Sequence, residues 1–192
     1  MPINYVIVDI ESCPIKLELY KNLYEEERRK LLNPIDSKII AIGTRCLEKN
    51  EIFCSENEKE ILESFWKEWI KIKQLNRNTQ MCGFNILNFD IPFLVTRSLI
   101  NNVIISPFLL KSIIDLREKI NAYRYGETRG KLKEFALFLG LNVEDIDGKE
   151  IADLCIDKNW DKLKKYLAND LVITDELYKR VRDTKILEIN KW

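Results

Sequence analysis

The chain has 192 residues, carries 31 basic and 31 acidic side chains, and contains no histidine. The missing histidine excludes Ser-His-Asp and Cys-His catalysis and histidine-ligated metal sites. Any bound metal must be held by oxygen ligands, which favours hard ions such as Mg²⁺ or Mn²⁺, and any positive charge for a polyanion must be local or supplied by those ions.

The cysteines indicate a reducing compartment, because their number is odd and none forms a CxxC pair with another. This pattern argues against a disulfide framework and against a structural zinc site. No run approaches 18 apolar residues, so we expect no transmembrane helix and no membrane partner. The N-terminus opens with a strand-like run, so we expect no signal peptide and a cytoplasmic location. The five cysteines are Cys13, Cys46, Cys54, Cys82 and Cys155.

The first half of the chain alternates strand and helix patterns. Residues 12–37 separate the first two strands, and we expect a long connection with one short helix there. Apolar residues between Ile61 and Ile72 recur at helical spacing, and this stripe with its tryptophans is typical of core packing. We predict strands over 5–10, 38–44, 51–54 and 79–84, and a helix over 58–73.

The second half is mainly helical. Pro92 is tolerated only in the first turn of its helix. We predict a fifth strand over 112–116 and helices over 89–100, 132–139, 149–154 and 160–181. Strands early in the chain and helices late, with alternation between them, indicate an α/β or α+β domain.

Asp9 and Glu11 stand two residues apart at the end of the first predicted strand. Side chains two apart on a strand point to one face, and Ile10 between them points to the other. Buried carboxylates are costly unless they are paired or bind a metal. Two acids on one face of an apolar strand therefore suggest such a role, and a strand end that reaches solvent is the alternative.

Asp90 lies at the start of a predicted helix, after the polar turn NILNF at 85–89. An aspartate at this place is a common helix cap. Capping is therefore the structural alternative to a functional role for Asp90.

Tyr166 and Asp170 lie four residues apart in the last predicted helix. Residues at this spacing share a helix face, so a phenol and a carboxylate stand side by side. An ordinary hydrogen bond between the two on a half-buried face is the alternative.

Together these segments resemble a known family. DIE at 9–11, NILNFD at 85–90 and YLAND at 166–170 resemble, in order, the three exonuclease motifs of the DEDD superfamily. The tyrosine four residues before the last aspartate resembles the DEDDy branch, which includes the proofreading domains of family B DNA polymerases and related stand-alone exonucleases. GKLKEFALFLGL at 130–141 resembles the helix that precedes the third motif. The sister branch has histidine in place of the tyrosine and is excluded here.

The resemblance covers nearly the whole chain and implies its fold. We expect a single RNase H-like exonuclease domain over residues 1–192. Its α/β architecture would be a five-stranded mixed sheet flanked by helices, with Asp9 and Glu11 on the central strand.

The resemblance also implies a 3′–5′ exonuclease that uses two ions, Mg²⁺ or Mn²⁺, about 3.5–4 Å apart. Asp9 would bridge both ions. Glu11 and Asp170 would help bind the ion that carries the nucleophilic water, and Asp90 would hold the second ion through waters. Tyr166 would orient the attacking water, because a phenol with a pKa of about 10 is a poor base at neutral pH.

A basic segment is the candidate substrate contact. Residues 111–133 contain seven basic and three acidic side chains with tyrosines between them, a composition that suits a single strand through phosphate contacts and base stacking. A solvated loop is the alternative. The candidate substrate-binding residues are Arg129 and Lys131 from this segment, Asn85 from the second motif, and Ser12, which follows Glu11.

We expect the 3′ end of single-stranded nucleic acid as the substrate, with DNA favoured over RNA. A catalytically silent RNase H-like module that binds nucleic acid or protein is the alternative from another class. An endonuclease or a nucleotide phosphatase that uses the same metals stays open, as does a polymerase or repair partner.

Overall fold

A five-stranded mixed sheet forms the centre of the computed structural model, which describes residues 4–123, 130–143 and 150–190. β1 pairs with β2 in antiparallel fashion and with β4 in parallel, so it occupies the central position of the order β3-β2-β1-β4-β5. The strands are β1 (Tyr5–Pro14), β2 (Ser37–Cys46), β3 (Lys49–Cys54), β4 (Gln80–Gly83) and β5 (Ile114–Asp115). The predicted five-stranded mixed sheet is confirmed.

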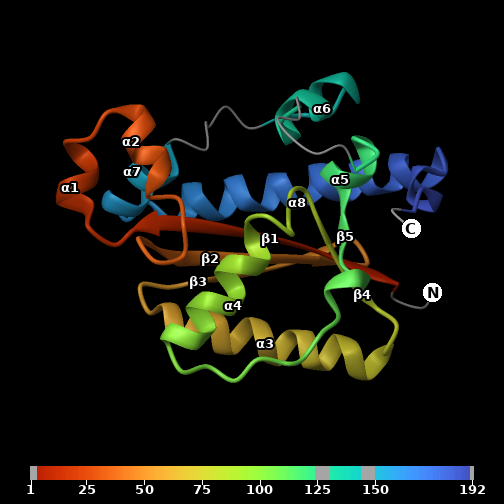
Figure 1. Ribbon diagram of the computed structural model, residues 1–192, viewed down its shortest axis with the longest axis horizontal. Coiled ribbons are helices and arrows are strands. Elements are labelled where there is room, and N and C mark those ends of the chain that lie inside the picture. The colour runs from red at the N-terminus through yellow and green to blue at the C-terminus, as the bar shows by residue number, and fades with distance from the viewer. Residues whose placement is uncertain (1–3, 124–129, 144–149, 191–192) are drawn as a thin grey trace.

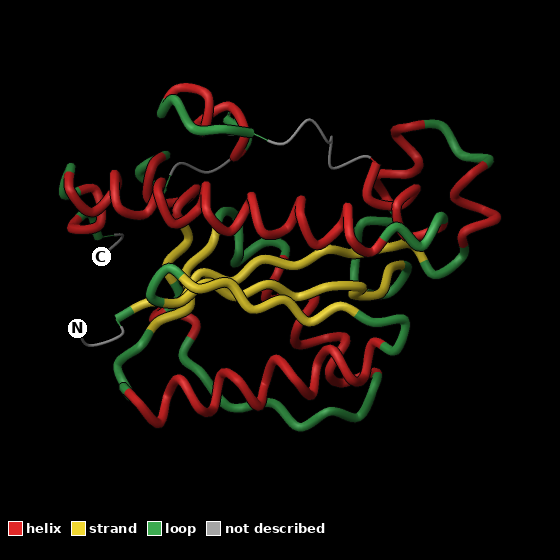
Figure 2. The backbone as a smooth tube through the Cα atoms, turned by 180° about the vertical axis from the view of Figure 1, so that it is seen from behind, coloured by secondary structure: helices red, strands yellow, loops and turns green. Residues whose placement is uncertain are grey.

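Helices cover both faces of this sheet (Figure 1). α3 (Glu58–Leu75) and α4 (Asp90–Ile100) pack on one face, and the long helix α8 (Trp160–Asp183) runs along the other. The view from behind shows the strands enclosed between these layers (Figure 2). The shorter helices are α1 (Leu17–Lys21), α2 (Glu25–Lys30), α5 (Leu116–Ile120), α6 (Leu132–Phe138) and α7 (Ile151–Ile156), with 3₁₀ turns at Leu110–Ser112 and Ile186–Glu188.

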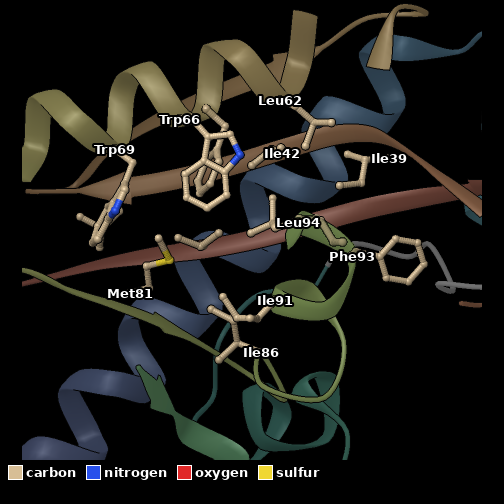
Figure 3. Packing of buried hydrophobic residues seen from close by; sticks show 14 of the residues in the cluster. Ile39, Ile42, Leu62, Trp66, Trp69, Met81, Ile86, Ile91, Phe93 and Leu94 are labelled. Atoms are coloured by element: carbon tan, nitrogen blue, oxygen red, sulfur yellow. The ribbon is translucent and has the colours of Figure 1, made fainter. Parts of the chain in front are cut away.

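The core between the sheet and α3 contains the predicted helical stripe. Trp66 and Trp69 are 2% and 3% exposed and point from α3 toward the strands (Figure 3). The Trp66 indole donates a hydrogen bond to Ser98 Oγ on α4 at 2.9 Å, which satisfies its buried N–H. The prediction that this stripe is core packing is confirmed for its buried members, whereas Ile70 is 44% exposed and lies outside the core.

The alternation of β1 decides where its acids point. Val6, Val8 and Ile10 belong to the core under α3 and α4, whereas Ile7 and Cys13 belong to the core under α8. Asp9 and Glu11 share the parity of Ile7 and Cys13, so they face α8.

The predicted connection over 12–37 is wrong in part. β1 continues to Pro14, and two short helices follow instead of one. In α2, three glutamates occupy the first turn and three basic residues the last. This order complements the helix dipole and stabilises a second helix.

The predicted strand over 112–116 is shorter than expected. β5 has two residues, because the Asp115 carboxylate accepts hydrogen bonds from the backbone N–H groups of Arg117 and Glu118 and thereby begins α5. Among the described residues, no helix combines the length and the apolar character that crossing a bilayer requires.

Candidate active site

Three of the four candidate carboxylates form one cluster. Asp9 and Glu11 on β1 and Asp170 on α8 each offer an oxygen, and these oxygens all lie within 4.8 Å of one another. The strand contributes two acids at a spacing of two residues, and the helix contributes the third across the interface between the two elements.

A glycine opposite Asp9 allows this approach. Gly43 on β2 pairs with Asp9 in the sheet register. A Cβ atom at Gly43 would lie 2.7 Å from Leu171 Cδ1 and 3.0 Å from Leu167 Cγ, both on α8. Since real Cβ contacts are longer, a larger residue at position 43 would force the Leu171 or Leu167 side chain of α8 to shift.

Asp90 contacts β1, the strand that carries Asp9 and Glu11, through a hydrogen bond. Its Oδ1 accepts a hydrogen bond from the Ile10 backbone N–H at 3.0 Å. The capping interpretation is wrong, because Phe89 occupies the cap position of α4 and no side chain caps it there. Asp90 lies within the buried interior at 3% exposure, where a carboxylate needs partners.

Tyr166 stands one turn before Asp170 on the buried face of α8. Lys133 of α6 places its Nζ 5.3 Å from the centroid of the Tyr166 ring, a cation–π distance. Lys133 therefore brings a positive charge to the edge of the carboxylate cluster.

The pKa values of the four acids reflect this crowding. Burial, followed by the charges of neighbouring carboxylates, raises the pKa of Asp9 and of Glu11 well above the usual range. Burial also raises the pKa of Asp90 to about 8 and that of Asp170 to about 6, although the Tyr166 hydroxyl and the Lys133 charge counteract the rise at Asp170. Burial and the nearby carboxylates raise the pKa of Tyr166 above its ordinary value, so its phenol stays protonated.

The cluster fits a hard divalent cation. All of its donors are carboxylate oxygens, the ligand type that Mg²⁺ and Mn²⁺ prefer. Asp170 Oδ1 is buried and has no hydrogen-bond partner within the described ranges, and a cation would satisfy it. A bound cation would also offset the mutual repulsion of the carboxylates.

A pocket of about 280 Å³ contains the whole constellation. It is lined by side chains from β1, from the turn that leads into α4, from α5, from the start of α6 and from α8. Its acidic and phenolic lining residues are Asp9, Glu11, Asp90, Tyr166 and Asp170, and its other lining residues are Ile10, Phe84, Asn85, Phe89, Arg117, Gly130, Lys131 and Leu132.

The predicted substrate-binding residues do not all lie at the carboxylate pocket. Asn85 and Lys131 line the carboxylate pocket. Ser12 is buried at 7% exposure and lines a neighbouring cavity of about 160 Å³ together with Tyr20 of α1. Arg129 lies outside the described residues.

Sequence reasoning did not single out Arg117 or Asp115. Arg117 belongs to the basic segment over 111–133, and the structure places it in the lining of the carboxylate pocket. Asp115 is buried and accepts hydrogen bonds from the Asn85 and Leu87 backbone N–H groups at 3.1 and 3.0 Å. An aspartate just before a helix is a local signal for a cap, but no local signal indicates that the same carboxylate also holds a turn some thirty residues earlier.

Comparisons with known proteins agree with this fold. The sequence matches the RNase_H superfamily over residues 30–182. An uncharacterized protein of Methanocaldococcus jannaschii is 33% identical, over 82% of this chain and 93% of that protein. The family B DNA polymerase from the hyperthermophilic archaeon Pyrobaculum calidifontis superposes on 97% of this chain with a TM-score of 0.72 and 15% identity.

At this identity, the likeness to the polymerase is one of fold, and the chain spans 25% of that polymerase's length. The superfamily match begins at the last residue of α2 and ends one residue before the end of α8, and it includes two of the three motif segments, those with Asp90 and Asp170. The chain belongs to the RNase_H superfamily.

Proposed function

We propose that this chain is a metal-dependent 3′–5′ exonuclease of the DEDDy type, folded as a single domain over residues 1–192. It removes nucleotides from the 3′ end of single-stranded nucleic acid, with DNA favoured over RNA. One observation carries the proposal: acids from three distant segments line one pocket, and Asp9, Glu11 and Asp170 bring their oxygens within 4.8 Å.

The carboxylates hold the metal in this proposal. Asp9, Glu11 and Asp170 form the first binding position, and Asp90 contributes to a second one beside Asp9. When bound, divalent ions supply Lewis-acid activation of water and neutralise charge that develops on the phosphate. Asp90 is held at its place by the hydrogen bond from Ile10 N–H, so its carboxylate keeps a fixed direction.

Tyr166 orients the attacking water by a hydrogen bond. Its raised pKa keeps the hydroxyl protonated at working pH, so it acts as a donor and acceptor and does not remove the proton as a base. The Lys133 ammonium group over the ring restricts the ring's position.

Cleavage of an end-labelled strand tests the proposal. The protein is incubated with a 5′-labelled single strand, as DNA and as RNA, in Mg²⁺ or Mn²⁺ and again with chelator, and the Asp9→Ala variant serves as the control for a contaminating nuclease. We expect a descending ladder that requires both metal and Asp9, with DNA degraded faster than RNA.

Two other outcomes would contradict the proposal. Cutting of a circular single strand would indicate an endonuclease, because an exonuclease needs an end. A folded protein that binds the strand and cleaves neither polymer would indicate the catalytically silent binding module.

A further inference from the structure

The first turn of α5 is built into the wall of the carboxylate pocket. The Asp115 carboxylate, 3% exposed, accepts hydrogen bonds from the backbone N–H groups of Asn85 and Leu87 in one segment. It also accepts hydrogen bonds from Arg117 N–H at 2.9 Å and Glu118 N–H at 3.3 Å in the other. One buried side chain therefore fixes the turn that leads to Asp90 and the start of α5 relative to each other.

Arg117 projects from this fixed helix start into the pocket lining. Its Nη1 donates a hydrogen bond to Asn85 Oδ1 at 3.3 Å. Asn85 itself adopts a left-handed backbone conformation with φ of 63°, which the Asp115 bond to its N–H helps to hold. The guanidinium group therefore has a defined place beside the metal-binding carboxylates.

The pocket needs a positively charged side chain to attract a polyanion. Four carboxylates line it, and even with two divalent ions bound they would leave no excess positive charge for an incoming polyanion. The cationic side chains among the described lining residues are Arg117 and Lys131. Lys131 is exposed, and arginine offers the planar fork of N–H donors that matches phosphate oxygens.

We propose that Arg117 binds a backbone phosphate of the strand whose 3′ end lies at the carboxylate cluster. This inference rests on the proposed exonuclease function and deepens it. Arg117 is a substrate-binding residue in this proposal.

Kinetics at graded salt concentrations test the role of Arg117. We compare the wild type with Arg117→Met, which removes the charge and keeps an unbranched side chain, and with Arg117→Lys, which keeps the charge. Loss of one charge-assisted hydrogen bond predicts that Arg117→Met raises KM roughly tenfold or more. The slope of log(kcat/KM) against log salt should become shallower by about 0.7, the value for one phosphate contact on a single strand. Arg117→Lys should keep the wild-type slope.

A modified substrate identifies the phosphate. Single linkages near the 3′ end are replaced one at a time by a neutral methylphosphonate. We expect one position at which the replacement raises KM for the wild type and has no further effect on Arg117→Met. Mn²⁺ binding in the absence of substrate and the thermal melt should be the same in both proteins.

The outcomes separate this inference from the proposed function. Wild-type cleavage with an unchanged KM and salt slope in Arg117→Met overturns the Arg117 proposal alone. Weaker Mn²⁺ binding or a lower melting temperature in Arg117→Met, with an unchanged salt slope, assigns Arg117 a structural role and also overturns it. A wild type that cleaves no strand overturns the proposed function and this inference together.

Discussion

At the scale of single residues, Tyr166 is the side chain whose role can be tested with the smallest change. Tyr166→Phe removes one hydroxyl and keeps the ring under Lys133. We expect kcat to fall roughly 10²-fold, because a poorly oriented water costs about that much, while Mn²⁺ affinity changes little. Single-turnover cleavage and metal titration measure the two quantities, and an unchanged rate would remove Tyr166 from the mechanism.

The raised pKa values of the acids predict how stability depends on pH in the metal-free protein. Asp170 and Asp90 have pKa values of about 6 and about 8 in the folded chain, against an ordinary value of about 3.9. The folded state therefore binds more protons than the unfolded state between pH 4 and pH 8. Stability from these groups is fully present below pH 4 and is lost as pH rises through 6 and then 8.

Asp90→Asn supplies the matched comparison for this pH dependence. Asparagine cannot ionise, so the free energy of unfolding of the variant should decline less than that of the wild type between pH 6 and pH 8 in chelator. Urea unfolding at a series of pH values measures the difference. Parallel pH profiles for the two proteins would show that Asp90 does not titrate in this range.

At the residue scale, the sequence identified candidate site residues where both members of a pair lie in one strand or one helix. The pair Asp9 and Glu11, and the pair Tyr166 and Asp170, each need only the period of one element to be placed on a common face. Arg117 and Asp115 could not be singled out in this way, because their importance arises from contacts with Asn85 across the fold.

At the scale of elements, α8, which carries Asp170, packs closely on β2 at Gly43. Gly43→Ala places a methyl group 2.7 Å from Leu171 Cδ1, and overpacking of this kind costs about 1–3 kcal/mol. We expect lower stability and weaker Mn²⁺ binding, because a displaced α8 would move Asp170 away from Asp9.

A second change can relieve this clash. The double variant Gly43→Ala/Leu171→Val removes one methyl group at the contact, so it should recover part of the lost metal affinity even though Leu171→Val alone lowers stability. A double-mutant cycle from thermal melts and metal titrations measures the coupling. Additive effects would show that the contact between position 43 and Leu171 does not control the cluster.

At the element scale the helices over 58–73, 89–100 and 160–181 were predicted within a few residues of α3, α4 and α8. Their apolar faces repeat over several turns, so the pattern is strong. The short elements α1, α5 and β5 were missed or mismatched, because five residues or fewer carry little periodicity and their ends depend on contacts such as the Asp115 cap.

At the scale of the whole molecule, bound metal would connect β1, the turn before α4 and α8. A ligand that binds only the folded state at 100 times its Kd adds about 2.7 kcal/mol of stability. For a chain of this size that corresponds to a rise in Tm of roughly 5–10 °C. We expect this rise with Mn²⁺ in the wild type and its loss in Asp170→Asn. A scanning calorimeter measures both, and an equal rise in both proteins would place the metal elsewhere.

The sequence by itself determined the inward and outward faces of the long elements, the order of the three motifs and the absence of histidine chemistry. These properties depend on residue identity and on spacings of two to four residues. Through a family resemblance, it also supported the expectation that Asp9 and Glu11 lie on the central strand. The strand order confirms this expectation.

Only the tertiary structure decided which distant side chains meet. The parallel pairing of β1 with β4, the close approach of α8 over Gly43 and the attachment of α5 to the Asn85 turn all join segments far apart in the chain. Such pairings are selected by the packing of the whole core, because a single strand or helix can present the same face to many partners. The 4.8 Å carboxylate cluster and the place of Arg117 beside it are therefore properties of the fold.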